Sequence, residues 1–287
     1  MTRVAIVTDS TALIPPELSE GLPIYTIPQH LIWGGKNYQD NIDIQAKEFY
    51  ERLKIDPAPP QTSQITPEEF KPLFQQLHEQ GCQILCIHVS ARLTGTLDSA
   101  VRASQAFPGT MFAFVDSLSA AMGLGFQVIA AARAAARGAA LAECQQLAEQ
   151  ACRLSGTMFV PGTLEYLHRG GRIGGASALV GSVLQIKPVL EVQEGIVAVI
   201  DRIRTLNRAV DRMLDLFSMR VGDRSPVHIA ALHSNFHHMA VSVMDRVCER
   251  LGKERLRTRI ISDISPVVGT HIGPDAVGLA YLAGMEL

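Results

Sequence analysis

The feature that most constrains this chain is the regular alternation of apolar runs and helical segments over its first 155 residues. Apolar runs at 4–7, 83–89 and 111–115 have the length of buried strands, and segments 122–136 and 142–154 have helical patterns. Strands that alternate with helices predict a parallel sheet covered by helices. We therefore predict an N-terminal α/β domain of this kind.

The pattern changes after about residue 155, where the alternation becomes irregular. Strands are predicted at 158–160, 190–192, 200–204, 227–233 and 257–261, and helices at 207–220 and 240–252. A chain of 287 residues suits two domains, because domains commonly span roughly 100–200 residues. We predict an N-terminal domain over 1–155 and a C-terminal α/β domain with a mixed sheet over 156–287.

Two short motifs indicate local boundaries in the N-terminal half. Thr66 followed by Pro67 predicts a helix start, and Glu69 completes a capping box with Thr66. Gly34-Gly35 predicts a hairpin turn after a strand-like stretch at 24–32.

Charge, cysteine content and hydropathy exclude several classes of protein. The 26 basic and 28 acidic side chains leave no positive excess for binding nucleic acid. The five cysteines include no CxxC pair, so we expect free thiols. No apolar run approaches the ~18 residues of a membrane span, and the N-terminal run is too short for a secretory signal. These observations predict a cytoplasmic protein.

The familiar motifs of catalysis are missing from the sequence. It has no GxxxxGK[ST] phosphate-binding loop, no dinucleotide fingerprint, no GxSxG elbow, and no HExxH or Cys/His spacing for a metal. We therefore predict no catalytic residue, no metal site and no cofactor in this chain.

Hydroxyl-rich turns are concentrated where predicted strands end or helices begin. They are Thr8-Asp9-Ser10, Thr62-Ser63-Gln64, segment 90–96 and Asp116-Ser117. Such residues commonly cap helices. On one edge of a parallel sheet they could also offer neutral donors to a single oxyanion, together with helix N-terminal amides. Both interpretations stay open at this point.

Segment 164–188 carries two arginines around a flexible Gly170-Gly171 pair. Arg169 and Arg172 suit contact with a carboxylate or phosphate, because guanidinium groups bind both in a forked geometry. A solvated basic turn is an equal alternative.

Two further stretches bear on a binding site. Residues 176–184 are predicted to form a helix that is apolar nearly all round, which indicates deep burial, an interface or an apolar ligand. In the glycine-rich loop 269–274, His271 follows Thr270. A lone histidine is more often structural, but its place in a rigid loop makes a functional role arguable.

Taken together, these motifs resemble the DegV family, which includes the fatty-acid-binding (FakB-type) subunits of bacterial fatty acid kinase. The matching pieces occur in family order at 6–10, 62–64, 90–96, 115–117, 164–188, 202–205 and 268–273. The resemblance implies a two-domain α/β fold with one buried long-chain acyl ligand. It also implies a partner, an ATP-dependent kinase subunit that converts the bound carboxylate to an acyl phosphate.

The resemblance also assigns residues to this site. It places the acyl carboxylate near Thr62, Ser63, Thr94 and His271. Arg172 and Arg204 are expected to face the phosphoryl-transfer partner. We expect both arginines to lie outside the tunnel lining, because a long charged side chain is costly in a dry tunnel.

The expected function is that of a non-catalytic carrier with a long-chain fatty acid as ligand, no nucleic acid, no membrane span and possible transient membrane contact for lipid exchange. Two alternatives remain. One is a lipid-sensing regulatory protein without kinase coupling, and the other is a stand-alone phosphotransferase or hydrolase, distantly like dihydroxyacetone kinases. The missing nucleotide loop and metal carboxylates weigh against the second.

Overall fold

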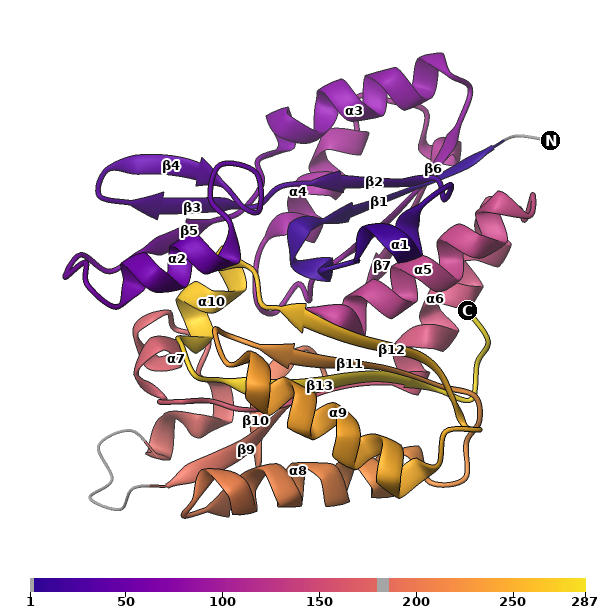
Figure 1. Cartoon of the computed structure of the whole chain (residues 1–287). Helices are drawn as coiled ribbons and strands as arrows, with labels where there is room; N and C mark the ends of the chain where they lie inside the picture. Colours follow the sequence, from indigo (N-terminus) through magenta and orange to yellow (C-terminus); the bar gives the residue numbers. More distant parts are fainter. Residues whose placement is uncertain (1–2, 180–185) are drawn as a thin grey trace.

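Two neighbouring helices, α5 (Met122–Ala136) and α6 (Leu141–Leu154), contact strands of both larger β-sheets, so that the chain folds in layers (Figure 1). The computed structural model describes residues 3–179 and 186–287. Helix α5 is buried along most of its length and is apolar on every side. A helix of this composition belongs inside a protein. Each sheet therefore buries one face against α5.

The first sheet is parallel and lies in the N-terminal half. The elements there are β1 (Val4–Asp9), η1 (Ser10–Ala12), α1 (Pro16–Ser19), β2 (Ile24–Ile27), β3 (His30–Trp33), β4 (Lys36–Gln39), α2 (Ala46–Leu53), β5 (Gln61–Ser63), α3 (Pro67–Glu79), β6 (Gln83–His88), α4 (Thr96–Ser104), η2 (Gly109–Met111), β7 (Phe112–Asp116), α5 and α6 (Leu141–Leu154). Strands β2, β1, β6 and β7 pair in that order, all parallel. Along β1, Val4 and Ile6 pack in the core with α5, whereas Ala5 and Val7 pack with α3 and α4. The predicted parallel sheet wrapped by helices is confirmed.

A small antiparallel sheet, ordered β4-β3-β5, extends beside the parallel one and packs with α2 (Figure 1). The predicted hairpin is confirmed, because Gly34 and Gly35 join β3 to β4 with φ of 59° and 77°. The ring of Trp33 packs edge-on against Phe49 of α2, with centroids 5.4 Å apart. Strand β5 was not predicted, since its three residues carry no hydrophobic pattern. This sheet holds Thr62 of β5 against the C-terminal half.

The second sheet is mixed and has six strands. The elements there are β8 (Ser155–Val160), α7 (Glu165–Arg169), η3 (Gly174–Leu179), β9 (Lys187–Gln193), β10 (Ile196–Ile203), α8 (Leu206–Val221), β11 (Val227–His233), α9 (His237–Leu251), β12 (Leu256–Asp263), α10 (Pro266–Ile272) and β13 (Val277–Ala283). The strand order is β10-β9-β8-β13-β11-β12. Strands β11 and β12 run parallel and the other neighbouring pairs antiparallel. The predicted mixed sheet is confirmed.

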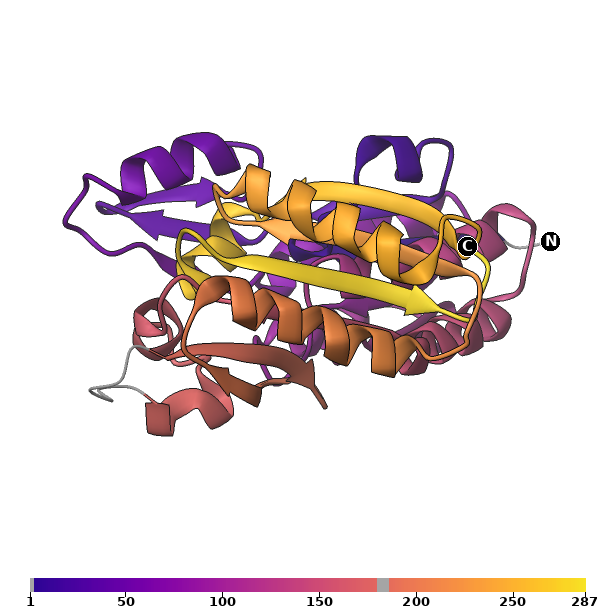
Figure 2. The ribbon, with the colours of Figure 1, turned by 60° about the horizontal axis from the view of Figure 1, so that its bottom comes forward.

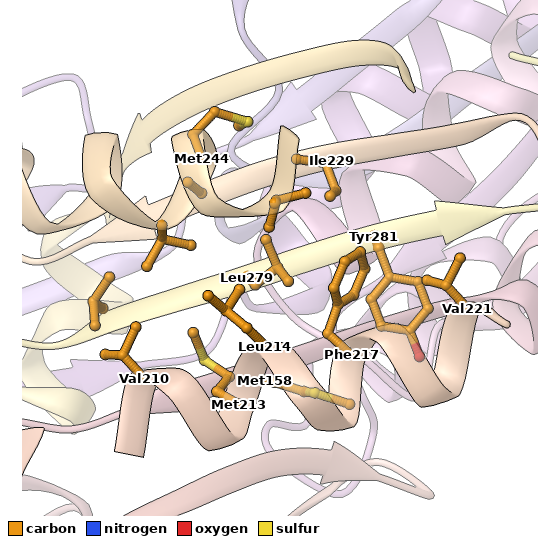
Figure 3. Close-up of a cluster of buried hydrophobic side chains, with 14 of the residues drawn as sticks. Met158, Val210, Met213, Leu214, Phe217, Val221, Ile229, Met244, Leu279 and Tyr281 are labelled. Carbon is orange, nitrogen blue, oxygen red and sulfur yellow. The ribbon is translucent and has the colours of Figure 1, made fainter. Parts of the chain in front are cut away.

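Helices α8 and α9 cover the outer face of this sheet (Figure 2). Figure 3 shows the core beneath them, where Leu214 and Phe217 of α8 point toward the strands. Phe217 meets Tyr281 of β13 with ring centroids 5.4 Å apart. The inner face packs on α5, where Phe126 shares a core with Leu232 of β11. The boundary predicted near residue 155 stays a prediction, because α5 contributes to the cores of both halves.

Several sequence expectations need correction. Stretch 24–32 is not one strand but two, β2 and β3, in different sheets. Strand β13 occupies the centre of the second sheet and was not predicted. The segment around His271 is a short helix, α10, rather than a loop. Of the helix predicted at 176–184, the structure describes a 3-10 helix that reaches Leu179, and residues 180–185 lie outside the described chain.

Candidate functional site

A cavity of about 280 Å³ lies between the two halves of the chain. One water needs roughly 10–15 Å³ on the same measure, so the space suits a ligand rather than a few waters. Its polar lining residues are Thr11, Gln29, Thr62, Ser63, Gln64, Thr94, Thr157, Arg172 and His271. Its other lining residues are Val89, Leu93, Ala120, Ala121, Phe159, Leu167, Val192, Val197, Leu232, Ile264, Val267, Val268, Ile272 and Gly278. A mostly apolar cavity with a few polar groups is the usual form of a small-molecule site.

The parts of the fold that form this cavity are far apart in the sequence. Strand β5 and the loop between β6 and α4 supply hydroxyl groups, whereas α10 supplies both His271 and the apolar Val267. Small residues at the start of α5, such as Ala121, give the lining room. The layered fold therefore brings polar and apolar groups to one space.

Thr62 and His271 meet in the cavity from opposite halves of the chain. Thr62 Oγ1 lies 2.9 Å from His271 Nε2. Burial, and then the nearby Arg172 charge, lower the pKa of His271 to about 4. The imidazole is therefore neutral at pH 7 and forms this bond as a neutral group. Its Nδ1 is buried without a hydrogen-bond partner among the described residues.

Thr94 lies in the loop before α4, at the same cavity. Its Oγ1 is 3.2 Å from Thr96 Oγ1, which accepts a hydrogen bond of 2.9 Å from Gln29 Nε2. Ser63 is exposed and also lines the cavity, where its hydroxyl donates to the carbonyl of Gln64. The structure therefore brings Thr62, Thr94, Ser63 and His271 to one cavity, and their contact with a carboxylate stays a prediction.

The two arginines are placed differently from each other. Arg172 lines the cavity, so the expectation that it lies outside the lining is wrong. Its Nε donates to the carbonyl of Leu93 at 3.1 Å and its Nη1 to that of Gly170 at 2.7 Å. Arg172 is half-buried, and these two bonds give its guanidinium group polar partners beside the apolar lining. Arg204 follows β10, is exposed and does not line the cavity, as expected.

The Thr8-Asp9-Ser10 turn has a structural role rather than a place in the lining. Asp9 Oδ2 lies 3.0 Å from His88 Nδ1 and accepts the N–H of Val89 at 3.1 Å, which joins β1 to β6. Burial acts to raise the pKa of Asp9. The pKa is nevertheless lowered, because Asp9 forms a hydrogen bond and a charge interaction with His88 and accepts a hydrogen bond from Thr11. Thr11 and Val89 line the cavity and donate their N–H groups to Asp9, so Asp9 positions lining residues without itself lining the cavity.

A second buried carboxylate fixes α10. Asp40 Oδ1 accepts the N–H of Val267 at 3.0 Å, and its Oδ2 accepts the Ser10 hydroxyl at 2.7 Å. Burial raises the pKa of Asp40. The Asp116-Ser117 turn, in contrast, has a structural role, because the Asp116 carboxylate accepts the backbone N–H groups of Leu118 and of Ala91 in the 90–96 turn. Of the four hydroxyl-rich turns, only the second and third bring their own motif residues to the cavity.

The sequence did not single out Gln29 or Thr157, which also line the cavity. Gln29 is 3% exposed and stands in the turn between two short strands. In the sequence, Gln29 is simply a polar residue after Pro28, and this pattern does not predict whether the side chain is buried or exposed. Among the described residues, no group of three or more His, Cys, Asp or Glu is placed to hold a metal ion. Nor is any described helix long and apolar enough to cross a membrane.

Comparison with known proteins identifies relatives over nearly the whole chain. The model of the DegV family, whose members are described as uncharacterised, matches residues 3–284. A DegV domain-containing protein of Clostridium perfringens is 32% identical over 282 residues, with 97% of this chain and 98% of the relative covered. One of Streptomyces coelicolor is 34% identical over 278 residues, with 96% and 97% covered. The resemblance inferred from the motifs is confirmed.

Solved structures share the fold. A DegV family protein from Thermus thermophilus, described as binding fatty acid, superposes with a TM-score of 0.91 at 30% identity, covering 98% of this chain and all of the other. DegV from Bacillus subtilis, described as a fatty acid binding protein, gives a TM-score of 0.89 at 27% identity, with 99% and 100% covered. The α/β fold class is thereby confirmed.

Proposed function

Since this chain belongs to the DegV family, we propose that it binds one long-chain fatty acid in the cavity and presents the carboxylate to a separate ATP-dependent kinase subunit. The single observation that carries the proposal is the cavity itself, which combines a long apolar lining with clustered neutral hydroxyls. That two structural relatives are described as binding fatty acids supports the choice of ligand.

Apolar burial supplies most of the affinity in this proposal. Each buried methylene contributes about 0.8 kcal/mol, so a sixteen-carbon tail contributes on the order of 10 kcal/mol before the costs of binding. Aliphatic and small side chains in the lining, such as Ala121, Leu232 and Ile264, offer contacts for such a tail. A short or strongly polar ligand would gain little there.

Hydroxyl groups recognise the head group in this proposal. Thr62 and Thr94 donate to the carboxylate, and Ser63 and His271 lie beside them. His271 is neutral, so it does not form an ion pair with the carboxylate. Arg172 and Arg204 then meet the kinase partner or the transferring phosphate, where charge develops.

The chain itself supplies no catalytic residue and no cofactor in this proposal, and the chemistry belongs to the kinase subunit. We place the protein in the bacterial cytoplasm. Exchange of the lipid would take place through transient contact with a membrane.

Purified protein is expected to carry fatty acid near one molecule per chain, because a dry apolar cavity holds its ligand through isolation. Extraction with organic solvent and mass spectrometry of the lipid measure this directly, and also give chain length and saturation. Protein that is empty, and that takes up no added fatty acid, would remove the proposed ligand.

Replacing Thr94 with valine is expected to lower fatty-acid affinity about 10-fold or more, since a hydrogen bond to a charged group contributes about 1.5–3 kcal/mol. The substitution keeps the shape of the side chain and removes the donor. Affinity for the matching fatty alcohol should change little. Thr110→Val, at an exposed site away from the cavity, is the control. An equal loss for acid and alcohol would indicate packing instead of carboxylate recognition.

A further inference from the structure

Gly170 lies so close to His271 that no side chain fits between them. A Cβ atom built on Gly170 would lie 2.2 Å from His271 Nδ1 and 3.1 Å from its Cε1. The glycine is not there for its backbone freedom, because its φ of −76° and ψ of −6° are open to any residue. The contact with the imidazole is therefore what requires a glycine.

Hydrogen bonds on both sides of Gly170 restrain its backbone beside the ring. Its N–H donates to the carbonyl of Tyr166 at 2.9 Å, and its carbonyl accepts from Arg172 Nη1 at 2.7 Å. Arg172 also binds the carbonyl of Leu93, next to Thr94. Arg172 thus links Gly170, which lies against His271, to the loop that carries Thr94.

We infer that Gly170 is a positioning residue, which seals the Nδ1 side of His271 so that the imidazole can bond only through Nε2 to Thr62. This role rests on the proposed fatty-acid function. A proton on Nδ1 would be a buried donor with no acceptor among the described residues, which is costly, so the proton resides on Nε2 and is donated to Thr62 Oγ1. The hydroxyl proton of Thr62 then points into the cavity, toward the carboxylate of the ligand.

Gly170→Ala tests this role by forcing the imidazole to turn. We expect fatty-acid affinity to fall about 10-fold, which matches the loss of one hydrogen bond to a charged group, while fatty-alcohol affinity stays within about 2-fold. Gly175→Ala is the matched control, because a Cβ there meets nothing within 4 Å and its φ is not positive. Equal losses for acid and alcohol, or no loss, would overturn the inference.

A double-mutant cycle separates positioning from a general structural effect. In a His271→Ala background, Gly170→Ala is expected to cause no further loss of acid affinity, because the ring that it displaces is gone. Losses that add in the double variant would mean that Gly170 acts through some other contact, and would contradict the inference.

A measurement on the unchanged protein keeps the inference testable if the variant does not fold. Nitrogen NMR of ligand-free wild-type protein should show His271 with the proton on Nε2 and none on Nδ1 at pH 7. A proton on Nδ1 would overturn the inference. This readout is independent of lipid, so failure of wild-type protein to bind fatty acid would reject the proposed function and leave the placement of His271 to be decided by NMR alone.

Discussion

Replacing Asp9 with alanine is expected to lower the free energy of unfolding by about 2–5 kcal/mol, because each buried donor that loses its partner costs about 1–3 kcal/mol. Asp9 and His88 are both fully buried, and their side chains are 3.0 Å apart. The same carboxylate accepts the N–H groups of Thr11 and Val89. Alanine would leave these donors without a partner in a region closed to water, which is costly.

The contribution of Asp9 should depend on pH in one direction. Its pKa in the folded protein lies below 3.8, its ordinary value, so the unfolded chain binds the proton more tightly. The stabilisation is therefore present above pH 3.8 and is lost as pH falls from there through the lower, folded pKa. Wild type and variant should thus differ less in strongly acidic solution than at pH 7.

Urea unfolding at pH 7 and at successively lower pH measures both effects. Asp223→Ala is the control, since Asp223 is exposed and surface substitutions usually change stability by no more than about 0.5 kcal/mol. A loss below about 1 kcal/mol for Asp9→Ala would mean that the hydrogen bonds of Asp9 do not hold β1 to β6. Lower fatty-acid affinity is expected beside the loss of stability, because Thr11 and Val89 line the cavity.

Hydrophobic periodicity predicts many of the helices and strands of this fold. Helix α2 (Ala46–Leu53), α5 and β11 begin and end close to where apolar patterns begin and end. The capping box is also present, with the N–H of Thr66 donating to Glu69 Oε2 at 2.7 Å. These elements were predictable because local sequence alone determines them.

Elements that depend on tertiary pairing were not predictable in the same way. Strand β5 has three residues and is fixed by pairing with β3, where Leu31 lies opposite Thr62. Strand β13 has one glycine and two alanines among its seven residues, and its pairing with β8 and β11 makes it a central strand. Helix α10 depends on Asp40, which lies far away in the sequence and binds the N–H of Val267.

The candidate site shows the same division. The resemblance to the DegV family assigned Thr62, Thr94 and His271 to one head-group site. The structure places all three at one cavity. The cost of burying a charged side chain predicted that Arg172 would lie outside an apolar lining. It lines the cavity nevertheless, because two backbone carbonyls bind its guanidinium group, and sequence alone does not reveal such partners.

Replacing either Arg172 or Arg204 with alanine is expected to lower acyl phosphate formation at least about 10-fold, which is roughly 1.4 kcal/mol of lost interaction. The two variants should differ in lipid binding. Arg204→Ala should bind fatty acid like wild type, because this residue is exposed and outside the cavity lining. Arg172→Ala should lose fatty-acid affinity as well, since Arg172 joins the loop of Thr94 to Gly170.

The assay combines each variant with the kinase subunit and ATP, and measures lipid binding on the same preparations. Arg137→Ala is the control, because Arg137 is exposed beyond the end of α5 that is remote from Ala121. Exposed arginines often contribute only about 0–1 kcal/mol through surface ion pairs, so a small effect at Arg204 would match that ordinary role. Turnover like wild type in both variants would remove the arginines from the mechanism. A protein that binds fatty acid without that coupling would then be better explained as a lipid sensor than as a carrier for a kinase.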